Sequence, residues 1–229
     1  MIKANLDKVR ARIAAAAKEG GQNPEDIVLI AVTKTHPAEV INEALSLGVT
    51  HIGENRPQEV RDKFPLVEGK ANWHLIGQLQ TNKIKYIIDK VCMIHSVDSV
   101  RLMDEIDRHA QKHDLVMDIL IQVNISGEET KSGIAPDELS DILTHAGELS
   151  NIRVRGLMTI APNAEDAIVE KCFSDMSILY KQTAQKTYKN VTMDYLSMGM
   201  SGDYEKAIKH GANMVRVGRS IFGAREYAK

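Results

Sequence analysis

Lys34 is the residue of this sequence whose surroundings most favour covalent chemistry. It follows the most apolar strand-like run in the chain, IVLIAVT at 27–33. An amine beside apolar walls loses hydration, which lowers its pKa and frees its lone pair for attack on a carbonyl. Lys34 is therefore a candidate for forming a Schiff base. The alternative is a surface lysine at the end of a strand, which is the commoner use of a single lysine in such a place.

Two glycine-bearing segments near the end of the sequence favour a bound anion. MGMSGD at 198–203 leads from a strand-like run into a helical one, and RVGRS at 216–220 does the same. At such turns, backbone N–H groups and a serine hydroxyl converge on an anion. Neither segment has the spacing of a Walker loop or a dinucleotide fingerprint. Either segment alone fits an ordinary turn that needs glycine for positive φ, but the two together favour a phosphate.

The elements that must position these residues alternate along the whole chain, with short β-branched runs followed by helical patterns. Eight strands, each followed by a helix, fit a single α/β domain over 1–229, a (β/α)8 TIM barrel, better than an open doubly wound sheet. An amphipathic helix over 1–20 precedes the barrel. The expected strands are 27–33, 50–53, 72–77, 92–96, 117–124, 153–159, 195–198 and 213–218. Helical patterns cover 38–47, 101–113, 137–149, 165–187 and 204–210.

The carboxyl ends of the expected strands carry polar residues, and barrel enzymes place their chemistry there. Lys34 ends the first strand, and the two glycine segments follow strands seven and eight, which is the usual phosphate site of this fold. A lysine and a phosphate site so placed describe a cofactor that lies across the barrel mouth with an aldehyde at the lysine. Pyridoxal 5′-phosphate (PLP) fits this description.

Charge and composition exclude several classes of partner. The chain has 29 basic and 31 acidic residues, spread along the sequence, so no electrostatic excess recruits nucleic acid or an anionic membrane. Charges interrupt the first helix before a signal-peptide core can form, and no apolar run approaches the ~20 residues of a membrane span. We therefore expect a cytoplasmic protein. Cys92 and Cys172 lie far apart without a CxxC pair, so we expect buried, reduced thiols and no metal site.

Several motifs resemble those of the pyridoxal phosphate homeostasis protein family. They extend from the first strand to the last helix, and the combination of WHLIGxLQ with SMGMS is far more specific than any single glycine pattern. The resemblance implies the fold-type III PLP barrel that is also seen in alanine racemases. The motifs are AVTK (31–34), HIGENRPQE (51–59), WHLIGQLQTNK (73–83), IHSVDS (94–99), GLMTIAP (156–162), LSMGMSGDYEKAI (196–208) and VRVGRSIFGAR (215–225).

The resemblance implies roles for the matching residues. Lys34 would carry PLP as a Schiff base. Ser201, Gly218 and Arg219 match phosphate-contacting positions; the last is often Thr in similar proteins, so Arg219 is expected to contribute its backbone N–H. Arg216 resembles the arginine that faces the pyridine nitrogen. A permanently charged guanidinium donates to that nitrogen without readily leaving a proton there, so the ring is a weaker electron sink.

Four further residues match positions around the cofactor ring. Asn55 and His74 match positions near the ring and the Schiff base; the alternatives are a loop turn for Asn55 and a satisfied core histidine for His74. Met198 and Met158 would supply apolar walls, and ordinary core packing is the alternative for both.

Two functions fit these residues. The resemblance implies a non-catalytic protein that takes part in intracellular PLP homeostasis, binding the cofactor and releasing it to apo PLP-dependent enzymes. The alternative is an amino-acid racemase or related PLP enzyme, which needs a second base on the opposite face of the substrate carbon; in barrel racemases this is a tyrosine on a separate domain. Only four residues follow Arg225, so we expect no such domain and no lid over the mouth.

A third hypothesis, an unrelated phosphorylated substrate with a structural Lys34, predicts a colourless protein. We favour the carrier and expect a monomer.

Overall fold

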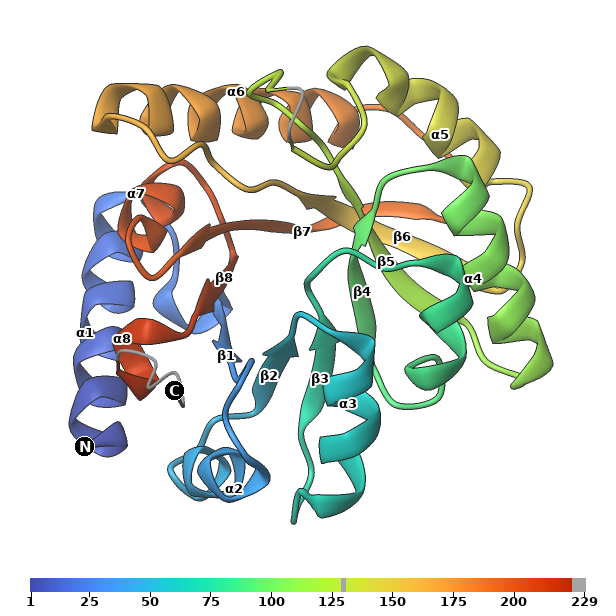
Figure 1. Ribbon diagram of the computed structural model, residues 1–229. Coiled ribbons are helices and arrows are strands. Elements are labelled where there is room, and N and C mark those ends of the chain that lie inside the picture. Colours follow the sequence, from blue (N-terminus) through green and yellow to red (C-terminus); the bar gives the residue numbers. More distant parts are fainter. Residues whose placement is uncertain (129–130, 224–229) are drawn as a thin grey trace.

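Eight parallel strands close into a barrel, and the helices that connect them lie on its outside (Figure 1). The computed structural model describes residues 1–128 and 131–223. Each strand pairs with the next, and β8 closes onto β1. This confirms the predicted (β/α)8 barrel. The strands are β1 Val28–Val32, β2 His51–Glu54, β3 Asn72–Leu75, β4 Met93–Val97, β5 Met117–Gln122, β6 Ile152–Met158, β7 Val191–Met200 and β8 Met214–Val217.

The helices follow the expected pattern, with additions. The helix that the sequence predicts over 1–20 is α1, and the connection between β3 and β4 is a 3-10 helix rather than an α-helix. The α-helices are α1 Ile2–Glu19, α2 Ala38–Ser46, α3 Pro57–Lys63, α4 Val100–Lys112, α5 Leu139–Ala146, α6 Asp166–Ala184, α7 Tyr204–Lys209 and α8 Arg219–Phe222. The 3-10 helices are η1 Pro24–Asp26, η2 Phe64–Leu66, η3 Thr81–Tyr86 and η4 Pro136–Glu138. Of the described helices, none is long and apolar enough to cross a membrane.

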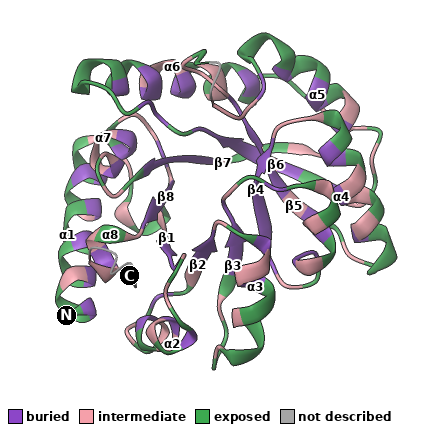
Figure 2. Cartoon of the chain, in the orientation of Figure 1, coloured by how far each residue is buried: buried purple, intermediate pink, exposed green. Residues whose placement is uncertain are grey.

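Apolar side chains fill the space on both sides of the strands. Figure 2 shows buried residues along the strands and on the inner faces of the helices, whose outer faces are exposed. The larger cluster lies between the strands and the helices. The barrel interior is a packed core, as this fold requires, rather than a pore. Its apolar cluster consists of Ile30, Met93, Leu120, Met158 and Met214, from five different strands.

The N-terminal helix α1 packs beside α7 and α8 (Figure 1). Leu6, Val9 and Ile13 bury one face of it, because residues three and four apart share a helix face. The Asn5 side chain donates a hydrogen bond to the Ile221 carbonyl in α8 at 3.0 Å. The helix therefore supports the segment that follows β8.

Candidate functional site

Lys34 lies half-buried in the turn that follows β1. The next residue, Thr35, has φ of 69°, a left-handed conformation that non-glycine residues adopt only where surrounding contacts fix them. Such contacts are present on both sides of Lys34. The Thr35 N–H donates to Glu59 Oε2 at 2.8 Å, and Lys63 Nζ donates to the Thr33 carbonyl at 3.0 Å. The structure thus fixes the backbone from which Lys34 projects.

The buried carboxyl group of Glu54 supports the same turn. Glu54, the last residue of β2, is fully buried and accepts hydrogen bonds through Oε1 from Thr33 Oγ1 at 2.7 Å and from Lys63 Nζ at 2.9 Å. Its other oxygen, Oε2, is buried without a hydrogen-bond partner among the described residues. Burial raises the pKa of Glu54 to about 7, although Lys63 and Thr33 act in the opposite direction.

The two predicted phosphate segments meet at the barrel mouth. The Gly218 N–H donates to Ser201 Oγ at 3.1 Å, and Ser220 Oγ donates to the Ser201 carbonyl at 3.3 Å. Helix α8 begins at Arg219, so its first N–H groups have no acceptor within the helix. The Arg219 side chain is exposed, which fits a contribution from its backbone alone. The Ser201 hydroxyl, the Gly218 N–H and the Ser220 hydroxyl, from the loops after β7 and β8, therefore gather at one point of the barrel mouth.

This place adjoins the Lys34 turn. Strands β1 and β8 are neighbours in the barrel, and a Cβ added to Gly218 would lie 3.2 Å from the Val32 carbonyl oxygen. Within the Lys34 turn, the His36 ring lies 4.8 Å, centroid to centroid, from the Phe222 ring in α8. The Lys34 turn and the segment that follows β8 are thus neighbours, in contact through the His36 and Phe222 rings.

Arg216 is the buried cation of the site, with 4% of its surface exposed. Its Nη1 donates to Ser197 Oγ at 2.6 Å and its Nη2 to the Thr159 carbonyl at 2.9 Å. Burial lowers the pKa of Arg216 to about 10, while Asp203 raises it. The guanidinium therefore keeps its charge at neutral pH. Of its five N–H donors, Ser197 and Thr159 take two within the described part of the chain.

His74 lies inside the barrel, 2% exposed, in a line of hydrogen-bonded histidines. Its Nε2 is 2.9 Å from His51 Nδ1, and its Nδ1 is 2.9 Å from His95 Nε2. Burial, with a contribution from His51, lowers the pKa of His74 to about 3, and burial also lowers that of His95. Both rings are therefore neutral at physiological pH.

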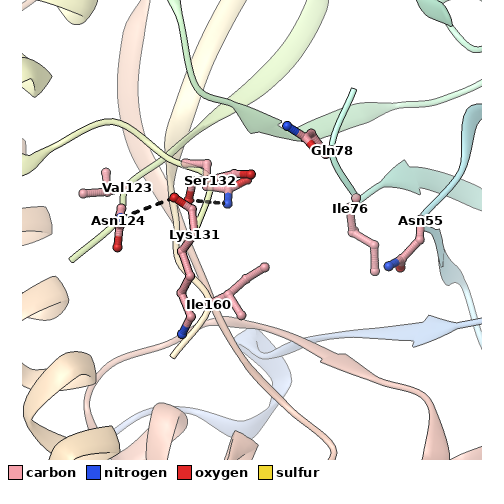
Figure 3. Close-up of a pocket in the computed structure, with 10 residues that line it drawn as sticks. Asn55, Ile76, Gln78, Val123, Asn124, Lys131, Ser132 and Ile160 are labelled. Carbon is pink, nitrogen blue, oxygen red and sulfur yellow. Dashed lines mark hydrogen bonds between the residues drawn. The ribbon is translucent and has the colours of Figure 1, made fainter. Parts of the chain in front are cut away.

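Asn55 follows β2 and lines a cavity of about 230 Å³ at the carboxyl ends of β2, β3, β5 and β6 (Figure 3). The other residues that line it are Ile76, Gly77, Gln78, Gln122, Val123, Asn124, Lys131, Ser132 and Ile160. Lys34, Ser201 and Arg216 are not part of this lining. Of the predicted cofactor-binding residues, only Asn55 lines this cavity.

Met158 and Met198 are both fully buried in apolar clusters. Met158 belongs to the cluster inside the barrel, and Met198 to the cluster between strands and helices. Core packing, the alternative for both, describes their surroundings.

One expectation for the cysteines is wrong. Cys172 is buried as expected, but Cys92 is exposed, because β4 begins only at Met93. The Cys92 thiol donates to the Trp73 carbonyl at 3.1 Å and lies 3.6 Å from His74 Nε2.

The geometry defines a class of protein: a (β/α)8 barrel with a lysine-bearing turn after β1 and, after the neighbouring β8, a glycine–serine segment that contacts Ser201. The family model that matches is the N-terminal domain of alanine racemase, over residues 3–226. The chain belongs to the family of pyridoxal phosphate homeostasis proteins. It is 43% identical over 226 residues to the protein of that name from Aquifex aeolicus, covering 97% of each chain. The corresponding Escherichia coli K12 protein is 39% identical over 230 residues, with 98% of this chain and 97% of that one covered.

Solved structures agree with this assignment. PipY of Synechococcus elongatus PCC7942, in the structure with PLP bound, has a TM-score of 0.82 at 33% identity, covering 97% of this chain and all of that one. An alanine racemase from Clostridium difficile 630 has a TM-score of 0.74 at 17% identity, covering 99% of this chain and 57% of the racemase. The second likeness is one of fold.

Proposed function

We propose that this chain binds PLP at the barrel mouth, attached to Lys34, and holds it for delivery to PLP-dependent enzymes rather than for catalysis. The observation that carries the proposal is that the Lys34 turn packs, through His36 and Phe222, against the segment after β8, whose Gly218 N–H donates to Ser201 Oγ. Relatives that are 36–43% identical bear the name pyridoxal phosphate homeostasis protein, and PipY was solved with PLP bound. We further propose that the chain acts as a cytoplasmic monomer.

The residues present fit each part of the cofactor. Ser201 Oγ, the Gly218 backbone and the first N–H groups of α8 supply donors for a phosphate. The N–H groups of Arg216 that Ser197 and Thr159 leave available suit the acceptor nitrogen of a pyridine ring. When bound, PLP supplies an aldehyde that condenses reversibly with an amine. The chain contributes that amine at Lys34, on a backbone held by Lys63 and Glu59.

A racemase mechanism would need one tyrosine as a second base. The surroundings of the described tyrosines support a non-catalytic role instead. Tyr180 donates to a backbone carbonyl, Tyr188 contacts Ser140, and Tyr204 is buried in the core. Tyr86 lies beside Arg61, and Tyr195 beside Arg155. Tyr227 lies outside the described residues. Tyr180 and Tyr188 use their hydroxyls in other hydrogen bonds, and the Tyr204 hydroxyl is enclosed in the core without a partner among the described residues. The proposal assigns none of the described tyrosines to the acid–base chemistry of a substrate.

A transfer assay tests this proposal. The protein is loaded with PLP, desalted, and mixed with an apo PLP-dependent enzyme, whose activity is then followed. We expect the wild type and the control Lys112→Ala, at the end of α4, to restore that activity, and Lys34→Ala to fail after the same loading. Restoration by Lys34→Ala at the wild-type level would contradict the proposal. So would Lys34-dependent turnover of free amino acids by the loaded protein at about 1 per second or faster.

A further inference from the structure

A continuous hydrogen-bonded chain crosses the barrel interior and ends at Arg216. It starts at His51, the half-buried first residue of β2, and passes through His74 and His95, with 2.9 Å between the ring nitrogens at each step. His95 Nδ1 then lies 3.1 Å from Ser197 Oγ, which accepts the Arg216 hydrogen bond at 2.6 Å. We call His51, His74, His95 and Ser197 the histidine relay.

The chemistry of imidazole couples the three rings. A neutral imidazole has one N–H donor and one acceptor nitrogen, so a ring that donates on one side must accept on the other. The relay therefore has two consistent directions. In the inward direction each ring donates toward Ser197, and Ser197 Oγ accepts from both His95 and Arg216. In the outward direction the Ser197 hydroxyl donates to His95, and its oxygen accepts from Arg216.

Only the outer end of the relay is placed to take up a proton from solvent. Burial lowers the pKa of His51, but to a smaller extent than that of His74, which falls to about 3. His51 Nε2 lies 3.5 Å from Asn72 Nδ2, an amide donor, and both residues reach the surface. This contact fits the inward direction, in which Nε2 accepts; in the outward direction the Asn72 amide turns over and presents its oxygen to Nε2–H. A proton on His51 makes both of its nitrogens donors, which excludes the outward direction throughout the relay.

The other titratable groups around the relay do not provide a competing proton. Next to His74 is the Cys92 thiol. The residue as a whole is exposed, but its sulfur lies against the Trp73 carbonyl and the His74 ring, and this burial raises the pKa of the thiol to about 12, with Asp118 acting in the same direction. At the inner end is Arg216, with Asp203 acting on it through its charge. The thiol is neutral and the guanidinium charged across the range in which histidines titrate.

We infer that the histidine relay positions Arg216 against the ring nitrogen of the bound cofactor, with the protonation of His51 setting the direction of the relay. A hydroxyl that donates becomes a better acceptor, because hydrogen bonds in a chain polarise one another. Neutral His51 permits the outward direction, in which Ser197 accepts the Arg216 hydrogen bond most strongly. Protonation of His51 excludes that direction and so weakens the hydrogen bond. The inference rests on the proposed function, since it concerns the group that faces the cofactor.

Nitrogen NMR of the histidine rings tests the relay without any cofactor. In 15N-histidine-labelled protein, we expect the ring nitrogens of His74 and His95 to change tautomer with the same midpoint as the titration of His51. In His51→Gln their shifts should stay constant over that pH range. The control His113→Gln, at the exposed end of α4, should behave as wild type. Ring nitrogens of His74 and His95 that do not respond while His51 titrates would overturn the inference.

Binding of PLP as a function of pH tests the consequence. We expect the Kd of the wild type to rise by about two- to tenfold on protonation of His51, the range that one neutral hydrogen bond supports, with the bound cofactor's visible absorbance shifting at the same midpoint. The His51→Gln variant should lack this step, and His113→Gln should keep it. An identical step in His51→Gln would overturn the inference. A wild type that binds no PLP at any pH would instead refute the proposed function and with it the relay's role toward the cofactor. The NMR experiment would still show whether the tautomers of His74 and His95 follow the protonation of His51.

Discussion

Replacing Glu54 with glutamine should stabilise the protein more at pH 8 than at pH 5, relative to the wild type. Glu54 is fully buried, and its pKa is raised from 4.5 to about 7. The unfolded chain therefore releases this proton near pH 4.5, while the folded protein keeps it until about pH 7. Stability falls with rising pH across that window, because the folded state binds more protons. The shift corresponds to about 3 kcal/mol, most of which falls between pH 5 and pH 8.

Glutamine does not titrate, so the effect is measured as a difference. Urea unfolding followed by circular dichroism at several pH values gives the free energy of unfolding of wild type and Glu54→Gln. Their difference should grow by about 2–3 kcal/mol from pH 5 to pH 8. Glu59 does not blur this window, since hydrogen bonds from Lys63 and Thr35 outweigh its burial and lower its pKa. Glu39→Gln, exposed on α2, is the control. If the difference in free energy of unfolding between wild type and Glu54→Gln stays constant from pH 5 to pH 8, the raised pKa of Glu54 is refuted.

Three other predictions concern the barrel mouth. Gly199→Ala should destabilise the fold by about 2 kcal/mol or more, because Gly199 has φ of +92° and the added Cβ would lie 2.6 Å from a side-chain carbon of α7; Gly202→Ala, which enters open space, should change thermal stability little. Ser201→Ala combined with Gly218→Asp should weaken PLP retention on dialysis, by about 1.5–3 kcal/mol for each charge-assisted bond lost; unchanged occupancy would place the phosphate elsewhere. The loaded protein should show no substantial racemase, transaminase or decarboxylase turnover on a panel of amino acids, measured by chromatography of the products.

The barrel and the positions of its chemistry are predictable because their signals are local. Each β-branched run marked a strand, and the ends of those runs placed Lys34, Ser201 and Gly218 at one rim. Local patterns do not reveal the beginning of β7, because Thr192 and Asp194 give it a polar character. Its conformation comes from pairing with β6, where Arg155 binds Asp194 at 2.6 Å.

The histidine relay is beyond local signals. His95 and Ser197 are separated by 102 positions, and only closure of the barrel brings them together. Strand alternation does carry information about Met198, since neighbouring residues of a strand point to opposite faces. Ser197 points inward to Arg216, so Met198 points toward the helices, where it is buried. Its contact with the cofactor stays a prediction.

The attachment of PLP to Lys34 is the central claim, and borohydride reduction followed by peptide mapping tests it most directly. The protein is loaded with PLP, reduced, digested, and analysed by mass spectrometry. The account predicts a phosphopyridoxyl group on Lys34 as the dominant adduct, and its loss in Lys34→Ala. A dominant adduct on another lysine, with undiminished yield in Lys34→Ala, would contradict it.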